Sequence, residues 1–330
     1  MESSIHILIV DDVHPALLDA LETEGLKYDY RPDIMASDVK QVLSDFNVLI
    51  VRSKIQADRE MLEANPQLEL IMRAGSGMDN IDLEVADKLK ISCVNTPEAN
   101  CDAVGEQTVG MLLNLAHNIN KGSNEIALGI WDREGNRGFE IGTRTVGIIG
   151  YGNTGSAVAR KLEGFGCEIL AYDKYKEGFG NGVVQEVDLN RLLEEADVIS
   201  FHVPLTHETR SWINTDFIDS VRKPFVLLNL SRGGIMKTSD VVDGLKKGKI
   251  SGFASDVLEN EKLTSLSQIQ IEELNTLNEM NNVVLTPHVG GWTQESYRKI
   301  SEVLVKKLLA WRHIMNKGKN ANRRNTQFVG

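Results

Sequence analysis

A glycine-rich loop between an apolar strand and a helix constrains the fold of this chain most strongly. The loop is Gly150-Tyr151-Gly152-Asn153-Thr154-Gly155, and it follows the β-branched apolar run 145–149, which is typical of a buried strand. A helical pattern at 156–162 comes next, and a second apolar run, 169–172, ends in Asp173. A strand, spaced glycines, a helix and a second strand that ends in an acid predict a unit that binds a dinucleotide.

Each glycine of this loop has a physical role. Gly150 permits a tight turn, Gly152 lets the backbone approach a pyrophosphate, and Gly155 lets the helix pack close to the strand. Unpaired N–H groups and the positive end of the helix dipole attract the phosphates. Asp173 can accept hydrogen bonds from the adenosine ribose and would repel the additional phosphate of NADP, so the pattern favours NAD. The alternative is an ordinary βαβ unit with a glycine-rich turn.

Composition argues against several other classes of protein. The 330 residues carry a net charge of −11 without a basic stripe, so we expect no nucleic-acid partner. Cys93, Cys101 and Cys167 are scattered, so neither a disulfide framework nor a metal site is expected, which suits a reducing cytoplasm. No apolar stretch approaches the length of a membrane span, and the run 5–10 is too short for a signal peptide. We therefore expect a cytoplasmic protein without a nucleic-acid or membrane partner.

Apolar runs alternate with helical patterns along the chain, which predicts an α/β fold with parallel sheets. Besides the two runs that flank the glycine loop, such runs lie at 5–10, 46–51, 68–72, 198–202, 225–230, 252–255 and 283–286. Residues 101–118 have apolar positions at helical spacing, and we expect this helix to cross from a first domain to a second. A last helix is predicted from Thr293, its N-cap, to about residue 316. This helix would return the chain to the first domain, which would then be discontinuous.

Three strands after the glycine loop end in polar residues that can carry chemistry. Arg232 follows the run 225–230, and its guanidinium can bind a carboxylate through two parallel hydrogen bonds. Glu261 belongs to an acidic segment after 252–255, and His288 follows 283–286. Taken singly, each of these could be an ordinary surface residue. Because the carboxyl ends of parallel strands meet at one edge, together they predict acid–base chemistry beside a bound anion.

These motifs, in this order, resemble the D-isomer-specific 2-hydroxyacid dehydrogenases over nearly the whole chain. Ser231-Arg232-Gly233-Gly234 resembles the family's arginine motif, Asp256-Val257-Leu258-Glu259-Asn260-Glu261 its D-V-F-x-x-E element, and Pro287-His288 its P-H motif. The resemblance implies an NAD-dependent oxidoreductase with two doubly wound α/β domains. A Rossmann NAD-binding domain, 99–289, would be inserted into a flavodoxin-like substrate domain made of 1–98 and 290–330.

The resemblance also implies roles for individual residues. Arg232 would hold the substrate carboxylate, His288 would exchange a proton with the substrate oxygen, and Glu261 would orient the imidazole and raise its pKa. Asp256 would accept a hydrogen bond from the nicotinamide carboxamide. The cofactor-binding candidates are Ser76, Thr108, Gly150, Gly152, Asn153, Thr154, Gly155, Asp173, His202, Val203, Pro204, Leu230, Ser231, Arg232, Asp256, His288, Gly290 and Gly291.

A segment before the glycine loop resembles the family's substrate loop, A-G-x-G-x-D-N-I-D, and begins at Arg73. Backbone N–H groups around Ser76 and Gly77 could bind the substrate carboxylate. Arg52, and with it Arg73, would pair with a substrate phosphate, although a surface salt bridge is the alternative for Arg52. The substrate-binding candidates are Arg52, Ser53, Arg73, Ser76, Gly77, Asn100 and Arg232.

The first expected substrate pair is 3-phosphoglycerate and 3-phosphohydroxypyruvate, a reaction of serine biosynthesis. The alternatives are a reductase of glyoxylate, hydroxypyruvate or another 2-keto acid and, from a different class, a binding protein that senses NAD(H). Two departures keep the substrate open: Lys262 replaces the proline that usually follows the catalytic carboxylate, and Trp292 replaces a smaller residue of phosphoglycerate dehydrogenases.

The resemblance implies a homodimer paired through residues 101–145, in which 129–133 with Trp131 reaches the partner. The chain ends before the regulatory domain of longer phosphoglycerate dehydrogenases, so we expect no inhibition by serine.

Overall fold

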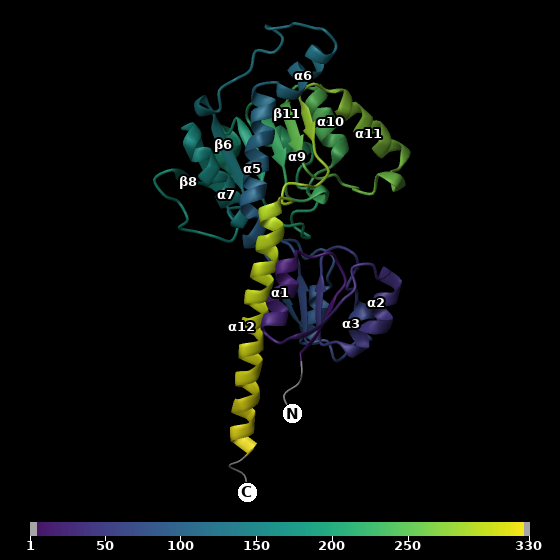
Figure 1. The fold of residues 1–330 in the computed structure, drawn as a ribbon. Coiled ribbons are helices and arrows are strands. Elements are labelled where there is room, and N and C mark those ends of the chain that lie inside the picture. The colour runs from purple at the N-terminus through teal and green to yellow at the C-terminus, as the bar shows by residue number, and fades with distance from the viewer. Residues whose placement is uncertain (1–4, 327–330) are drawn as a thin grey trace. The chain divides into compact units, whose positions relative to one another are not determined.

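The structure is a computed structural model of the chain, and it describes residues 5–326. The chain divides into two compact units (Figure 1). Unit 1 consists of Met1–Asn100 and Thr293–Gly330, and unit 2 is the continuous segment Cys101–Trp292.

Unit 1 is a parallel sheet with helices on both faces. Its strands are β1 (His6–Ile9), β2 (Lys27–Tyr30), β3 (Val48–Val51), β4 (Leu70–Arg73) and β5 (Ser92–Val94). They lie in the order β2-β1-β3-β4-β5, which is the flavodoxin-like order. The helical segments are α1 (Pro15–Thr23), α2 (Ala36–Val42), the 3₁₀ turn η1 (Leu43–Asp45), α3 (Arg59–Glu63), α4 (Leu83–Lys88) and α12 (Gln294–Thr326).

Alternation along the strands of unit 1 divides its core into two clusters. Ile7 and Ile9 of β1 pack in one cluster with α1 and with Leu304 of α12. Leu8 and Val10 point the other way and pack with α2, α3 and α4. Because successive side chains of a strand point to opposite faces, an unbroken apolar run such as β1 is buried on both sides.

Unit 2 is a larger parallel sheet. Its strands are β6 (Thr145–Ile149), β7 (Glu168–Tyr172), β8 (Val184–Glu186), β9 (Val198–Phe201), β10 (Phe225–Asn229), β11 (Ile250–Ser255) and β12 (Val283–Leu285). Their order is β12-β11-β10-β9-β6-β7-β8, the Rossmann order extended by β12. The α-helices are α5 (Pro97–Ala116), which begins in unit 1, α6 (Ile119–Ala127), α7 (Asn153–Leu162), α8 (Leu189–Glu195), α9 (Thr215–Ser220), α10 (Thr238–Lys246) and α11 (Gln268–Glu279). Four 3₁₀ turns are η2 (Ile141–Thr143), η3 (Glu163–Phe165), η4 (Gly233–Ile235) and η5 (Leu263–Ser265).

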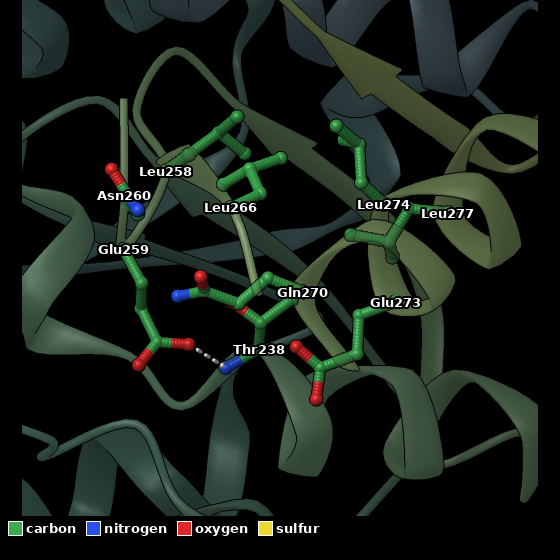
Figure 2. Close-up of a pocket in the computed structure, with 9 residues that line it drawn as sticks. All are labelled: Thr238, Leu258, Glu259, Asn260, Leu266, Gln270, Glu273, Leu274 and Leu277. Atoms are coloured by element: carbon green, nitrogen blue, oxygen red, sulfur yellow. Dashed lines mark hydrogen bonds between the residues drawn. The ribbon is translucent and has the colours of Figure 1, made fainter. Parts of the chain in front are cut away.

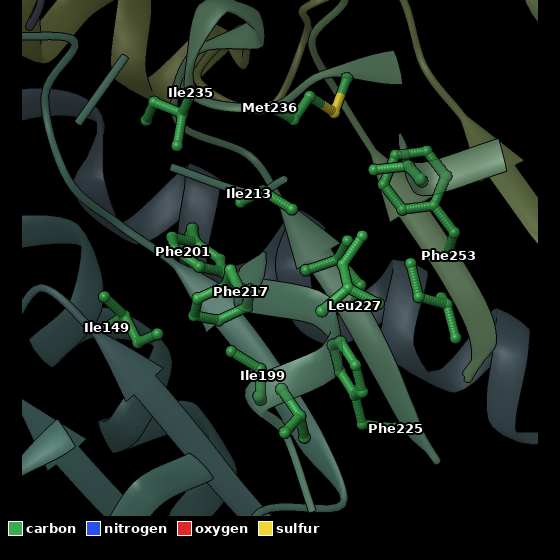
Figure 3. Packing of buried hydrophobic residues seen from close by; sticks show 14 of the residues in the cluster. Ile149, Ile199, Phe201, Ile213, Phe217, Phe225, Leu227, Ile235, Met236 and Phe253 are labelled. Carbon is green, nitrogen blue, oxygen red and sulfur yellow. The ribbon is translucent and has the colours of Figure 1, made fainter. Parts of the chain in front are cut away.

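The core of unit 2 also lies on both faces of its sheet. Phe201, Phe225 and Phe253 come from three neighbouring strands and pack under α8, α9 and α10 (Figure 3). On the other face, α5 and α7 cover Val146 and Ile148 of β6. Both faces are thus closed by helices, so the open positions of this sheet are its two ends.

The predicted α/β fold with doubly wound parallel sheets is confirmed. Every apolar run that predicted a strand forms one, but β2, β5 and β8 were not predicted from the sequence. Thr293 caps α12 as expected, because its Oγ1 accepts a hydrogen bond from Ser296 N at 3.1 Å. The end predicted for α12 near residue 316 is wrong, since the helix continues to Thr326 through a segment without proline. Within residues 5–326, we find no helix that is long and apolar enough to cross a membrane.

Candidate active site

The glycine loop follows β6 at the carboxyl edge of the unit 2 sheet and has no room for side chains at two positions. Gly150 has a φ of +93°, and a Cβ there would lie 2.6 Å from the carbonyl oxygen of His202. A Cβ at Gly155 would collide with the carbonyl oxygen of Gly150, whereas the space around Gly152 is open. No side chain caps the N-terminus of α7, so its N–H groups are available to a phosphate. The loop therefore fits the pyrophosphate of a dinucleotide.

Asp173, the acid after β7, lies against the glycine loop. Its Oδ2 accepts a hydrogen bond from Tyr151 N at 2.8 Å, and its Oδ1 accepts from Tyr175 N at 2.9 Å and Lys176 N at 3.1 Å. A carboxylate has about four acceptor positions, so Asp173 can also accept from a ribose hydroxyl.

His202, which follows β9, is half-buried, and the Nδ1 atom of its ring is shielded from solvent. Its Nε2 lies 2.8 Å from Ser200 Oγ, and Nδ1 has no hydrogen-bond partner among the described residues. Burial lowers the pKa of His202 to about 3, so the ring is neutral. The next residue, Val203, approaches the glycine loop, with Cγ1 2.8 Å from the position that a Cβ of Gly150 would take. Pro204 is exposed beside it.

His288 and Glu261 form a pair at the same edge of the sheet. Nδ1 of His288 lies 2.9 Å and 3.0 Å from the two carboxylate oxygens of Glu261. The two side chains are 47% and 45% exposed, so solvent and small molecules reach them. His288 has a φ of +55°, in the left-handed region that residues other than glycine seldom adopt. Strained backbone of this kind is concentrated at functional sites.

Asp256 holds the loop that carries His288. Its carboxylate is 3% exposed and accepts hydrogen bonds from Thr286 Oγ1 at 2.5 Å, Val289 N at 2.9 Å and Gly290 N at 2.7 Å. A Cβ at Gly290 would lie 2.9 Å from Asp256 Oδ2, so glycine lets the loop come this close. The sequence did not reveal this anchoring role, and the expected contact of Asp256 with nicotinamide stays a prediction.

Arg232 closes β10, which is separated from β12 by β11 alone. Its Nη1 donates to the carbonyl oxygen of Ser231 at 2.7 Å, and its own carbonyl oxygen accepts from Asn229 Nδ2 at 3.1 Å. Asn229 is fully buried and also accepts from Ser231 Oγ at 2.8 Å, so it fixes this turn. A Cβ at Gly233 would collide with the carbonyl oxygen of Leu258, so the arginine motif packs directly against the segment that leads to Glu261.

A small pocket beside this segment is lined by α10, α11 and residues 258–266 (Figure 2). Here Glu259 accepts a hydrogen bond from Thr238 N at 2.5 Å, at the N-terminus of α10. Leu258 and Leu266 line the apolar part of the pocket together with leucines of α11. Glu259 therefore anchors the chain two residues before Glu261, a contact that no sequence motif revealed.

The candidates of unit 1 gather at the carboxyl ends of its strands. Ser76 Oγ donates to Asn100 Oδ1 at 2.5 Å, and the carbonyl oxygen of Ser76 accepts from Asn95 Nδ2 at 2.5 Å. Gly75, with a φ of +147°, makes the turn that precedes Ser76 and Gly77. Thr108 belongs to unit 2, where it is buried in α5 and its Oγ1 donates to the Val104 carbonyl oxygen at 2.7 Å.

Arg52, after β3, lies near two carboxylates that the sequence did not connect with it. Its backbone N donates to Asp11 Oδ2 at 2.6 Å. Asp12 accepts hydrogen bonds from Tyr297 Oη at 2.6 Å and Tyr30 Oη at 2.9 Å, and these bonds hold the pKa of Asp12 below its usual value. Burial lowers the pKa of Arg52, while the charges of Asp11 and Asp12 oppose that shift.

A Rossmann sheet that carries an arginine and a histidine–carboxylate pair at its carboxyl edge defines a class of nucleotide-dependent oxidoreductases. Residues 109–290 match the family described as D-isomer specific 2-hydroxyacid dehydrogenase, NAD binding domain. The chain belongs to this family, whose cofactor is NAD and whose members are oxidoreductases.

Relatives of known activity agree on the family. The chain is 33% identical to a D-3-phosphoglycerate dehydrogenase of Methanocaldococcus jannaschii, over 92% of this chain and 57% of that protein. It is 35% identical to a hydroxypyruvate reductase of Thermotoga maritima, over 82% of this chain and 86% of that protein. A crystal structure of a D-lactate dehydrogenase from Aquifex aeolicus, complexed with NAD and lactic acid, is similar with a TM-score of 0.81 and 26% identity, over 93% of this chain and 95% of that one. The chain thus spans little more than half the length of the first relative, and the three proteins act on different acids.

Proposed function

We propose that this chain catalyses the NAD-dependent interconversion of a D-2-hydroxy acid and its 2-keto acid. The observation that carries the proposal is the bidentate approach of the Glu261 carboxylate to Nδ1 of His288, at 2.9 and 3.0 Å. A carboxylate facing Nδ1 fixes the orientation and tautomer of the ring and stabilises the imidazolium. Nε2 is then the atom that exchanges a proton with the substrate.

His288 and Arg232 have separate roles in the proposed reaction. During oxidation, Nε2 of His288 accepts the hydroxyl proton, and during reduction the imidazolium returns it to the keto oxygen. Arg232 binds the substrate carboxylate through parallel hydrogen bonds, and its charge stabilises the substrate oxygen as the proton moves. NAD, when bound, supplies the acceptor of the hydride that leaves the substrate carbon.

We propose that residues of the glycine loop and residues that follow neighbouring strands bind the cofactor. Gly150, Gly152 and the N-terminus of α7 would hold the pyrophosphate, with Asp173 on the adenosine ribose. The remaining proposed contacts are Ser76, Thr108, Asn153, Thr154, Gly155, His202, Val203, Pro204, Leu230, Ser231, Asp256, Gly290 and Gly291.

The first candidate substrate pair is 3-phosphoglycerate and 3-phosphohydroxypyruvate, which would place the enzyme in serine biosynthesis. Arg52 and Arg73 would bind the phosphate, while N–H groups at Ser76 and Gly77 would bind the carboxylate. The 33% identity to a D-3-phosphoglycerate dehydrogenase supports this candidate.

The charges around Arg52 favour a second candidate, an unphosphorylated 2-keto acid such as hydroxypyruvate or glyoxylate. Asp11 and Asp12 bring two negative charges to the surroundings of one guanidinium, and the lowered pKa of Asp12 keeps its carboxylate ionised. A dianionic phosphate would be repelled by these carboxylates, whereas a hydroxyl group would accept a hydrogen bond from Arg52 or donate one to Asp12. The 35% identity to a hydroxypyruvate reductase is consistent with this candidate.

The test is the change in NADH absorbance with purified protein and a panel of acids. The panel pairs 3-phosphohydroxypyruvate with hydroxypyruvate, glyoxylate and pyruvate, each with NADH and with NADPH. A preference for the phosphorylated acid supports the first candidate, and a preference for an unphosphorylated one supports the second. NADH binding without turnover of any acid would contradict both and favour the sensing role.

We also propose that the chain forms a homodimer through α6 and the segment that follows it. Leu128 and Trp131 of this region are 77% and 78% exposed, and Ile119, Ile126 and Ile130 are exposed with them. Five exposed apolar side chains within thirteen residues are unusual on a surface that faces only water, and they suit a protein interface. The three cysteines are unpaired, which supports the proposal of a reducing, cytoplasmic location.

A further inference from the structure

A cavity at the amino-terminal edge of the unit 2 sheet has no part in the proposed reaction. It measures about 350 Å³ and is lined at the starts of β9, β10 and β11, at the end of α5 and by residues 137–144. All strands of this sheet are parallel, so this edge is opposite to the one that carries the glycine loop and His288. Its volume lies within the range of about 300–1,000 Å³ that is typical of small-molecule sites.

Both aliphatic side chains and cationic groups line the cavity. Leu115 and Val226 contribute aliphatic side chains, while Arg137 and Arg144 contribute guanidinium groups. Such a pairing of apolar surface with a positive charge suits an amphipathic anion. The two positive charges of this cavity contrast with the net charge of −11 of the whole chain.

Arg144 is the cationic group of the cavity that makes no direct ion pair within the part of the chain that the structure describes, although its charge helps to lower the pKa of Asp197. Its guanidinium lies over the ring of Phe139, 4.9 Å from the centroid. Its Nε is buried and has no hydrogen-bond partner among the described residues, and no carboxylate of residues 5–326 forms an ion pair with it. A buried polar atom such as this Nε costs free energy unless a hydrogen-bond acceptor pairs with it.

The carboxylate that lines the cavity is already engaged. Asp197 forms an ion pair with Lys223 Nζ at 2.8 Å and accepts a hydrogen bond from Thr145 N at 2.9 Å. Arg137 has a partner too, since its Nη2 lies 2.8 Å from a carboxylate oxygen of Glu134. Arg144 therefore remains available to an anion that enters the cavity.

We propose that this cavity binds a small organic carboxylate, with its carboxylate group on Arg144 and its apolar part against Leu115 and Val226. The planar guanidinium matches a carboxylate with two parallel hydrogen bonds. The site lies apart from the proposed catalytic residues, so it would bind its ligand whichever acid the enzyme converts.

The probe is hexanoate, and hexanamide is its neutral control of similar shape. Both are titrated calorimetrically into the full-length protein saturated with NADH. We expect hexanoate to bind at least tenfold more tightly than hexanamide, because only the carboxylate pairs with a guanidinium. Equal affinities would overturn the proposal, since the cavity would then select shape and not charge.

Variants locate the binding site. Arg144→Gln should weaken hexanoate binding at least tenfold and leave turnover unchanged, whereas Arg137→Gln should change binding less than threefold. Arg232→Gln, which removes the proposed carboxylate ligand of the active site, should retain hexanoate binding. Loss of binding in Arg232→Gln together with retention in Arg144→Gln would place the ligand in the active site and refute the proposal.

A second variant tests the cavity without altering a charge. A Cβ at Gly252 would lie 3.6 Å from side-chain carbons of Leu115 and Val226, so Gly252→Val should fill the cavity without a clash at Cβ. We expect it to abolish hexanoate binding while far-UV circular dichroism stays unchanged, and unaltered binding would contradict the proposal. If Arg144→Gln dissociated a dimer that the unaltered protein forms, the counter-ion would belong to a second copy and the proposal would be wrong.

Discussion

The proton chemistry depends on one atom, Nε2 of His288, and on the carboxylate that holds the other side of the ring. We expect His288→Ala to lower kcat by roughly 10²–10⁴, the usual contribution of a general acid or base. Glu261→Gln keeps a hydrogen-bond acceptor at Nδ1 but loses its charge, so we expect a smaller loss, about tenfold or more. Stopped-flow turnover measures both effects, and NADH fluorescence is the control for cofactor binding, which should change less than threefold. Unchanged turnover of His288→Ala would refute the assignment.

A second single residue, Asp12, can be used to distinguish the two candidate substrates. Removing its charge leaves Arg52 less compensated, so Asp12→Asn should raise kcat/KM for 3-phosphohydroxypyruvate relative to hydroxypyruvate. The charge of a nearby carboxylate is worth about 1 kcal/mol, which corresponds to a change of roughly fivefold. Tyr30→Phe is the matched control, because it removes a hydrogen bond to Asp12 but keeps the charge. A shift toward hydroxypyruvate in Asp12→Asn would contradict this explanation.

At the scale of the elements, the sequence predicts the strands that have a continuous apolar run and misses those that lack one. The apolar runs of β6 and β9 lie in the interior of the sheet and are buried throughout, so they are readily recognised. The missed strands β2, β5 and β8 lie at sheet edges, where one side has no strand partner. These three strands are short and partly exposed and carry no continuous apolar pattern, whereas the edge strand β12 has one.

The same reasoning applies to the candidate site. The glycine loop and the motifs around Arg232 and His288 are local, so the sequence could indicate them. The anchoring of the His288 loop by Asp256 joins residues 30 or more positions apart, and the contact of Asp12 with Tyr297 spans 285 positions. No short pattern encodes such contacts, because they depend on how the strands and α12 pack in three dimensions.

His202 at the end of β9 makes the stability of the protein depend on pH. Its pKa is about 3 in the folded protein, against 6.5 for the ordinary group, because burial disfavours the charged ring. Between these values the unfolded chain binds a proton that the folded protein does not, so the free energy of unfolding falls as pH falls. The slope is about 1.4 kcal/mol per pH unit for one proton. His202→Gln should flatten the dependence between pH 6.5 and 4.5 in urea unfolding, and an unchanged slope would show that His202 is not buried as a neutral ring.

At the scale of the whole molecule, one sheet of unit 2 presents two chemically different ends. Its carboxyl edge collects the glycine loop, Arg232 and the Glu261–His288 pair, as is general for open α/β sheets. Its amino edge carries the cavity with Arg144. The strands that lie between these two ends are buried on both faces of the sheet, so the residues of each end are presented by a close-packed core.

The assembly of the molecule is expected to depend on the apolar surface formed by α6 and the segment up to Trp131. A tryptophan at the centre of an interface contributes about 2 kcal/mol or more, so Trp131→Ser should weaken dimerisation at least tenfold. Sedimentation equilibrium measures this change directly. Ile314→Ser is the matched control, because Ile314 is an exposed apolar residue of α12 and lies outside this surface. Dissociation by Trp131→Ser alone would support the proposed interface, whereas an unaltered protein that sediments as a monomer at all concentrations would refute it.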